Sequence, residues 1–91
     1  MYEDIWVFMA PGATFASGTF KELKIAEEWI ERHKLTGILT KYPVNVGVYD
    51  WAIETGKFRP KPKKEIDSKF IGQFTTALMS HHHYEDGICV G

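Results

Sequence analysis

Hydrophobic residues follow two different spacings along the chain, and each spacing predicts a different element. The continuous apolar run 5–9, closed by Pro11-Gly12, predicts a buried central strand followed by a turn. We expect the extended stretch 14–20 to pair with this strand as a hairpin. Between 21 and 34, apolar residues recur at three- and four-residue intervals instead, which predicts an amphipathic helix.

The ends of this predicted helix carry sequence signals. Thr19 and Glu22 have the spacing of a capping box, whose two side chains bond free amide groups of the first turn. Gly37 stands where a C-terminal stop is expected. The same helical period places His33 on the buried face, where we expect a core or helix-end histidine rather than a metal ligand.

The middle of the chain predicts a further strand and a second helix. The stretch 38–42 has strand character and ends at Pro43. Asn45 is placed to cap a helix over 46–55, whose exit is marked by Gly56.

The next segment has neither a helical nor a strand period. Residues 57–66 contain two prolines and a cluster of lysines, which predicts a basic, Pro-rich loop. Asp67 or Ser68 can then cap a short third helix, and a final strand is expected over 75–84.

The order of these predicted elements, β-β-α-β-α-α-β, describes an α+β fold. We expect a small, mostly antiparallel sheet of about four strands with two to three helices packed on one face. The chain of 91 residues suits a single domain spanning 1–91, since single cores commonly run to about 100–150 residues. Aromatic residues make up 14% of the chain, so we expect a core to form without disulfides or a structural metal.

Charge and cysteine content exclude several classes of protein. A formal net charge of -1 argues against a protein whose main task is to neutralise a phosphate backbone. Cys89 is the only cysteine, so neither an internal disulfide nor a thiolate zinc cage can form. No segment has the length of a membrane span or the charge pattern of a signal peptide. We expect a soluble cytoplasmic protein without a cofactor, in which Cys89 is a small apolar residue that finishes the fold.

The stretch SHHHYEDG gathers the chain's most prominent candidate ligands. Strand alternation places His81, His83 and Glu85 on one face and His82 and Tyr84 on the other. Two imidazoles and a carboxylate are a ligand set of zinc and iron sites. Because residues two apart on a strand are separated by about 6.6–6.8 Å, a ligand at i+4 is usually out of reach. A complete metal site would therefore need a ligand from elsewhere.

The alternative interpretation of this stretch is structural. Glu85-Asp86-Gly87 has the composition of a turn, so the histidines would form the polar end of the last strand, at the rim of a binding surface with Tyr84. We favour this interpretation, and metal binding by His81, His83 and Glu85 is the rival hypothesis.

The stretch YDWAIE offers a pair of carboxylates on the second predicted helix. Asp50 and Glu54 stand at i, i+4, and paired carboxylates can do acid–base chemistry when burial raises the pKa of one of them. We expect Trp51 and Ala52 to occupy the buried side of that helix, so that both acids face water. The chain also has no Gly-rich nucleotide-binding loop, P-loop or nucleophile elbow. We therefore assign no catalytic residue and favour a protein that is not an enzyme.

Aromatic residues with a polar tip are enriched at protein interfaces, which makes two regions of this chain candidate binding surfaces. One is the neighbourhood of 42–49, and the other is the 81–86 end. The residues selected from these regions are Tyr42, Tyr49, Asp50, His82, Tyr84 and Glu85.

The segment KFRPKPKK concentrates positive charge between Lys57 and Lys64. Such charge can steer an acidic partner, including nucleic acid. Lys61, Lys63 and Lys64 lack the interleaved stacking aromatics of single-strand binders. Weak nucleic-acid binding through this loop is therefore a minor alternative.

The stretches YPVNVGVYDWAIE and HYEDG, together with FKELKIAEEWIERHKLTG and FIGQF, resemble a family of small bacterial proteins and domains of unknown function. The resemblance covers most of the chain. It implies a bacterial origin and a single domain, and it carries over no activity, cofactor or site residue.

The favoured hypothesis is a non-catalytic binding module that acts through a protein partner. Its support is the aromatic richness of a small, nearly neutral chain without an organised catalytic set. An immunity- or antitoxin-like role fits the size, and homodimerisation is a further expectation. No membrane association is expected.

Overall fold

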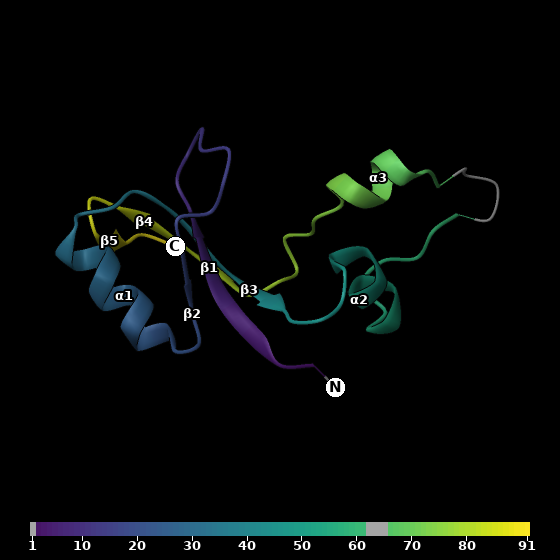
Figure 1. Ribbon diagram of the computed structural model, residues 1–91, viewed down its shortest axis with the longest axis horizontal. Coiled ribbons are helices and arrows are strands. Elements are labelled where there is room, and N and C mark those ends of the chain that lie inside the picture. Colours follow the sequence, from purple (N-terminus) through teal and green to yellow (C-terminus); the bar gives the residue numbers. More distant parts are fainter. Residues whose placement is uncertain (1, 62–65) are drawn as a thin grey trace.

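The apolar run near the N-terminus forms strand β1 (Asp4–Met9) inside an antiparallel sheet. In the computed structural model, which describes residues 2–61 and 66–91, this sheet has five strands in the order β2-β1-β3-β4-β5 (Figure 1). The predicted α+β class and antiparallel sheet are therefore confirmed. The other strands are β2 (Gly18–Phe20), β3 (Gly37–Pro43), β4 (His81–Glu85) and β5 (Ile88–Cys89), and the helices are α1 (Leu23–Arg32), α2 (Val48–Glu54) and α3 (Ser68–Gln73).

The main core lies between α1 and one face of the sheet. Ala26 and Ile30 of α1 and Leu39 of β3 are each 0% exposed, and Phe8 of β1 is 1% exposed. The ring of Trp29 meets Phe8 edge-on, with ring centroids 5.6 Å apart, and such aromatic pairs add about 0.5–1.5 kcal/mol beyond the burial of their area. The burial of Ala26 and Ile30 therefore confirms the predicted amphipathic helix.

The signals predicted for the ends of α1 are wrong. Thr19 belongs to β2, and Glu22 is itself the N-cap residue without a side-chain cap bond, so no capping box forms. At the other end Lys34, with φ 54°, takes the left-handed turn expected of a glycine. Gly37 instead begins β3.

His33 was expected to be a core or a helix-end histidine, and the structure shows the helix end. Since α1 ends at Arg32, His33 is the C-cap residue and its side chain is exposed. Its ring approaches Trp29 edge-on, with centroids 6.0 Å apart. Because the helix ends one residue before His33, the helical period no longer applies to this residue, and only the expectation of a core position is wrong.

The turn between β3 and α2 differs from the prediction at Asn45. Gly47 is the N-cap residue of α2, and no side chain caps this helix. Asn45 adopts φ 66°, a left-handed conformation that asparagine tolerates better than most residues. The start of the predicted helix is therefore too early, whereas its end at Gly56, with φ 74°, is confirmed.

Helices α2 and α3 lie away from α1, on the side where β3 ends (Figure 1), and an aromatic cluster holds them together. The cluster consists of Tyr49, Phe58, Phe70 and Phe74, whose ring centroids lie between 4.9 and 6.2 Å apart. Asp67 caps α3 as predicted, because its Oδ1 accepts a hydrogen bond of 2.8 Å from the N–H of Phe70. The described parts of the predicted basic loop, 57–61 and 66, have no regular secondary structure.

The region after α3 departs most from the predicted pattern. Residues 74–80 are turns and irregular structure, so only the last part of the predicted strand 75–84 is confirmed. Asp86 and Gly87 then form a two-residue turn with φ 49° and 86°, which is the backbone of a type I′ hairpin. The chain returns as β5, with Tyr84 opposite Cys89, and so adds a strand that the sequence pattern did not predict.

Candidate functional site

The sheet has one face that α1 does not cover, which we call the open face. Because side chains alternate along a strand, the neighbours of the buried Trp6 and Phe8 point to this side. Two open-face residues, Met9 and Ile38, lie opposite each other and are each 39% exposed. The members contributed by the three central strands are Ile5, Val7, Met9, Ile38, Thr40, Tyr42, His81 and His83.

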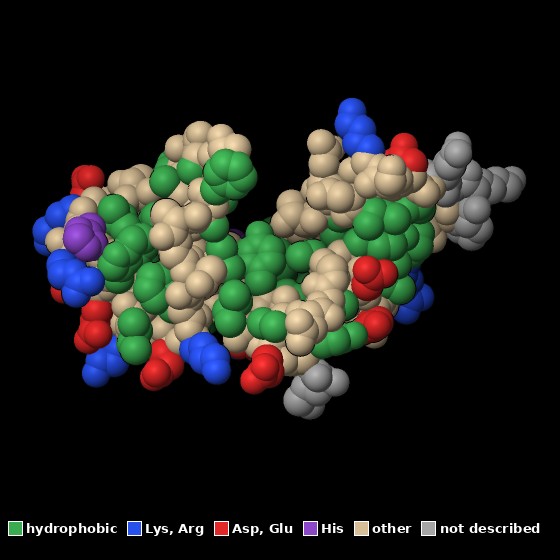
Figure 2. All heavy atoms as spheres, in the orientation of Figure 1, with side chains coloured by type: hydrophobic (Ala, Val, Ile, Leu, Met, Phe, Trp, Pro, Cys, Tyr) green, Lys and Arg blue, Asp and Glu red, His purple; other side chains and the backbone are tan. Residues whose placement is uncertain are grey.

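Apolar surface is accessible around the sheet. Figure 2 shows hydrophobic side chains at the bottom of a hollow between the loop that follows β1 and the α3 region. Phe15 in that loop is 81% exposed. A shallow cavity of about 370 Å³ lies at the β4–β5 side of the sheet, lined among others by Ile38, His83 and Val90. The open face is therefore accessible to solvent at Met9 and Ile38.

The histidine stretch divides between the two faces as the alternation predicts. His82 packs against Trp6 on the core side, with ring centroids 5.6 Å apart. Tyr84 is 3% exposed, and its hydroxyl donates a hydrogen bond of 2.8 Å to Oε2 of Glu27. Burial, followed by this hydrogen bond, raises the pKa of Tyr84. Tyr84 is thus a core residue, and its side chain is not available to a binding surface.

His81 and His83 share the open face, with ring centroids 5.3 Å apart. Nδ1 of His81 lies 2.8 Å from the backbone oxygen of Met79, which occupies one nitrogen of that ring. Among the residues that the structure describes, no group of three or more His, Cys, Asp or Glu side chains is arranged to hold a metal ion. The geometry offers a pair of imidazoles and gives no support to a three-ligand site with Glu85.

The remaining residues of the predicted binding surface do not form one patch. Tyr42 lies on the open face, whereas Tyr49 is enclosed in the aromatic cluster. Asp50 is exposed on α2, and Glu85 is exposed at the end of β4. Cys89 was expected to be a small apolar residue that finishes the fold, and it is exposed on the edge strand β5, because the unpredicted hairpin carries it there.

The two carboxylates of α2 face solvent, as predicted. Asp50 and Glu54 are exposed, whereas Ala52 between them is 0% exposed. Glu54 accepts a hydrogen bond of 2.6 Å from the hydroxyl of Tyr2. This bond is the main cause that raises the pKa of Tyr2, and the charges of Glu54 and Asp50 add to it.

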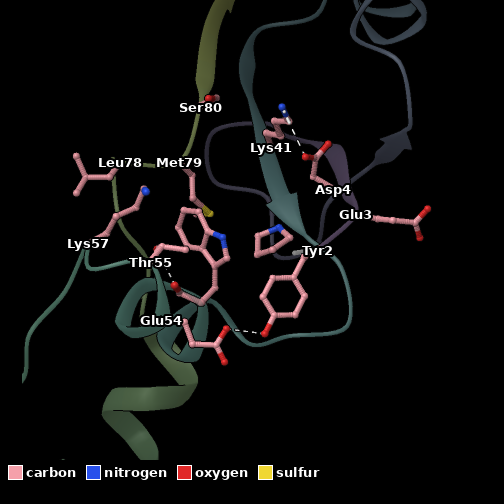
Figure 3. Close-up of a pocket in the computed structure, with 12 residues that line it drawn as sticks. Tyr2, Glu3, Asp4, Lys41, Glu54, Thr55, Lys57, Leu78, Met79 and Ser80 are labelled. Atoms are coloured by element: carbon pink, nitrogen blue, oxygen red, sulfur yellow. Dashed lines mark hydrogen bonds and ion pairs between the residues drawn. The ribbon is translucent and has the colours of Figure 1, made fainter.

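A cleft that the sequence did not predict lies between the sheet and α2 (Figure 3). Its volume is about 550 Å³, within the range of small-ligand pockets. Its walls come from segments 2–4, 41–43, 51–57 and 78–80. Because these segments are far apart in the sequence, no local spacing could have revealed the cleft.

Two lysines at this cleft lie against aromatic rings. Nζ of Lys57 is 5.1 Å from the centroid of the Trp51 ring. Nζ of Lys41 is 3.6 Å from Oδ2 of Asp4 and 5.8 Å from the centroid of the Trp6 ring. Both distances to the rings are within the range of cation–π attraction.

The basic loop predicted to bind nucleic acid is described only in part. Lys57, its first lysine, is engaged at the cleft, and Lys61 is exposed. Lys63 and Lys64 lie outside the described residues.

Comparison with known families gives one finding. The family model described as Domain of unknown function (DUF7710) matches residues 5–90, which confirms the resemblance to a family of uncharacterised domains. No curated protein and no solved structure matches the chain. In the part of the chain that the structure describes, no helix is long and apolar enough to cross a membrane.

Proposed function

Because the chain belongs to a family of domains of unknown function, its role has to be inferred from its own surface, and we propose that it is a non-catalytic module that binds a protein partner on the open face of its sheet. The partner would pack side chains against the outward positions of β1, β3 and β4.

The apolar character of the open face carries this proposal. An antiparallel sheet with one packed face usually alternates, with apolar residues toward the core and polar residues toward water. Strand β1 instead carries Ile5, Val7 and Met9 on its outward side. Met9 lies opposite Ile38 of β3, so apolar residues of two strands are adjacent. Exposed apolar patches of this kind mark interaction sites on soluble proteins.

The lack of charge on the outward sides of β1 and β3 favours the same conclusion. None of the outward positions of β1 and β3 is a charged residue, and burying an unpaired charge is costly. A partner can therefore cover these strands without that cost. A sheet face also suits a protein better than a small molecule, since small-molecule sites are concave.

The proposal is tested by affinity purification of the tagged chain from the cells that produce it. Ile38→Lys places a charge on the open face, next to Met9 of β1, at a position that is already 39% exposed, so the core is not disturbed. We expect the unmodified chain to recover a partner in near-stoichiometric amount and Ile38→Lys to lose at least about nine-tenths of it, since an unpaired charge in an interface costs several kcal/mol.

Ile25→Lys is the matched control, because it makes the same change at a residue of α1 that is 50% exposed. It should recover the partner as well as the unmodified chain does. Circular dichroism establishes that all three proteins are folded. Recovery of the chain alone at native abundance, or equal recovery by Ile38→Lys, contradicts the proposal.

Two forms of partner can be told apart with the same variants. A second copy of the chain would give a dimer in sedimentation velocity that Ile38→Lys dissociates. A toxin as the recovered partner would identify the immunity- or antitoxin-like role that the size of the chain favours.

A further inference from the structure

The cleft beside α2 combines an aromatic wall with carboxylates. Trp51 and Tyr2 contribute rings to its lining, and Asp4 and Glu54 contribute carboxylates. Figure 3 shows Tyr2 and Glu54 pointing toward one another, while Glu3 extends away at the rim. Such a combination of ring faces and carboxylates attracts organic cations, because the face of an aromatic ring carries negative charge density.

The balance of charge around the cleft is negative. Its lining contains three carboxylates and two lysines, and Asp50 adds a further negative charge that acts on Tyr2. Lys41 is already 3.6 Å from Asp4, so its charge is largely offset by that partner. The hydrogen bond to Glu54 is the first cause that raises the pKa of Tyr2, and the negative charges of Glu54 and Asp50 raise it further.

The chain itself already places a cation on the aromatic wall. Nζ of Lys57 lies 5.1 Å from the centroid of the Trp51 ring. The backbone of Lys57 is fixed, since its N–H donates a hydrogen bond of 2.8 Å to the oxygen of Ala52. Its side chain is exposed, so the ammonium group can leave the ring without unfolding the segment.

We propose that the cleft binds the cationic end of a basic side chain, a guanidinium or ammonium group on an apolar stem, presented by a peptide segment of a partner, and that Lys57 occupies this position until the ligand displaces it. The apolar stem would lie along Trp51, and the charged end would reach Glu54. The bond from Tyr2 uses Oε2 of Glu54 and orients a carboxylate that can accept more than one hydrogen bond. The site is separate from the open face, so the inference goes beyond the proposed function and does not depend on it.

The test is an NMR titration that follows the indole N–H signals of the chain's three tryptophans. The probes are the capped peptide acetyl-Gly-Arg-Gly-amide and its citrulline analogue, which has nearly the same shape and no charge. We expect the arginine peptide to shift the Trp51 signal saturably and to leave Trp29, which packs against the core cluster, unchanged. Equal shifts with the citrulline peptide would overturn the proposal.

Variants of the cleft separate binding from folding. Lys57→Met removes the competing cation and should tighten binding about two- to fivefold, the factor expected from one exposed cation–π contact. Glu54→Gln should weaken binding by a similar factor, whereas Glu28→Gln on the exposed side of α1 should leave it unchanged. Weaker or unaltered binding in Lys57→Met contradicts the role assigned to that lysine.

Free small cations are the second source of the same chemistry. N-propylguanidine, which carries a single guanidinium on an apolar stem without a peptide backbone, is titrated in parallel. Tighter binding of the peptide than of N-propylguanidine supports a partner protein as the source, and tighter binding of N-propylguanidine contradicts it. Ile38→Lys should bind the arginine peptide normally, so failure at the cleft and failure at the open face are distinguishable.

Discussion

At the scale of single residues, Tyr84 connects the sheet to α1, because its buried side chain donates a hydrogen bond to Glu27. The period of two correctly separates His81 and His83 from His82 and Tyr84. It cannot say which set faces the core, because that depends on where α1 lies across the sheet. Tyr84 was therefore predicted at a binding surface but is 3% exposed, bonded to Glu27 of α1.

The hydroxyl of Tyr84 provides a test of this arrangement. Tyr84→Phe removes the hydrogen bond of 2.8 Å to Glu27 and should lower the free energy of unfolding by about 1 kcal/mol, the typical net value of such a bond. Urea denaturation at neutral pH measures the change. Tyr42→Phe on the open face is the control and should change the stability by less than about 0.5 kcal/mol.

The same tyrosine predicts how stability responds to alkaline pH. Burial raises the pKa of Tyr84 in the folded state above its ordinary value of about 10. The unfolded chain therefore loses this proton first as the pH rises, and the folded state loses stability above about pH 10. Tyr84→Phe should show a shallower decline of the urea midpoint between pH 9 and 11 than the unmodified chain; parallel declines would contradict the assignment.

At the scale of elements, the differences between the predicted and the observed elements lie mainly at turns. The type and centre of β1, α1 and β3 follow from hydrophobic periodicity, because each contributes apolar side chains to the core. The hairpin of β4 and β5 was missed although Asp86-Gly87 is a strong type I′ signal, because β5 itself has only two residues. Asn45 and Lys34 take left-handed turns that displace the predicted caps.

Gly37 provides the element-scale prediction. A Cβ at this position would lie 2.6 Å from the backbone oxygen of Met9 and 2.6 Å from the ring of Phe8, so β1 and β3 could not keep their spacing. Gly37→Ala should therefore lower the free energy of unfolding by about 1–3 kcal/mol, the usual cost of overpacking. Thermal or urea denaturation checks this value.

Gly72 in α3 is the matched control for Gly37. A Cβ there meets nothing within 4 Å, and alanine favours helix over glycine by up to about 1 kcal/mol. Gly72→Ala should leave the stability unchanged or raise it slightly. A loss as large as that of Gly37→Ala would show that the close approach of β1 and β3 is not the cause.

At the scale of the whole molecule, the chain has a main core under α1 and a separate aromatic cluster between α2 and α3. Phe74→Ala removes a ring that contacts Tyr49, Phe58 and Phe70. Because these rings are only half-buried, we expect local opening rather than global unfolding. Amide hydrogen exchange in α2 and α3 should accelerate at least about tenfold while exchange in β1 and β3 stays unchanged; uniform acceleration would contradict this.

The same scale explains why neither candidate site was predicted as a whole. The open face arises because β1 is apolar on both sides. The sequence correctly predicts such a strand as central. It cannot show that no helix covers one of the two faces. The cleft joins Tyr2, Lys41, Trp51 and Met79, whose meeting depends on tertiary structure alone. Local spacing could not have brought these four residues together.

The strand order also determines when the fold can be completed during synthesis. Strand β3 pairs with β1 on one side and with β4 on the other, and the segment carrying α2 and α3 is made between them. While that segment is being synthesised at about 5–20 residues per second, β3 is a bare edge and the core still lacks Tyr84. The nascent chain therefore stays vulnerable to strand-to-strand aggregation until β4 has left the ribosome, however early α1 forms.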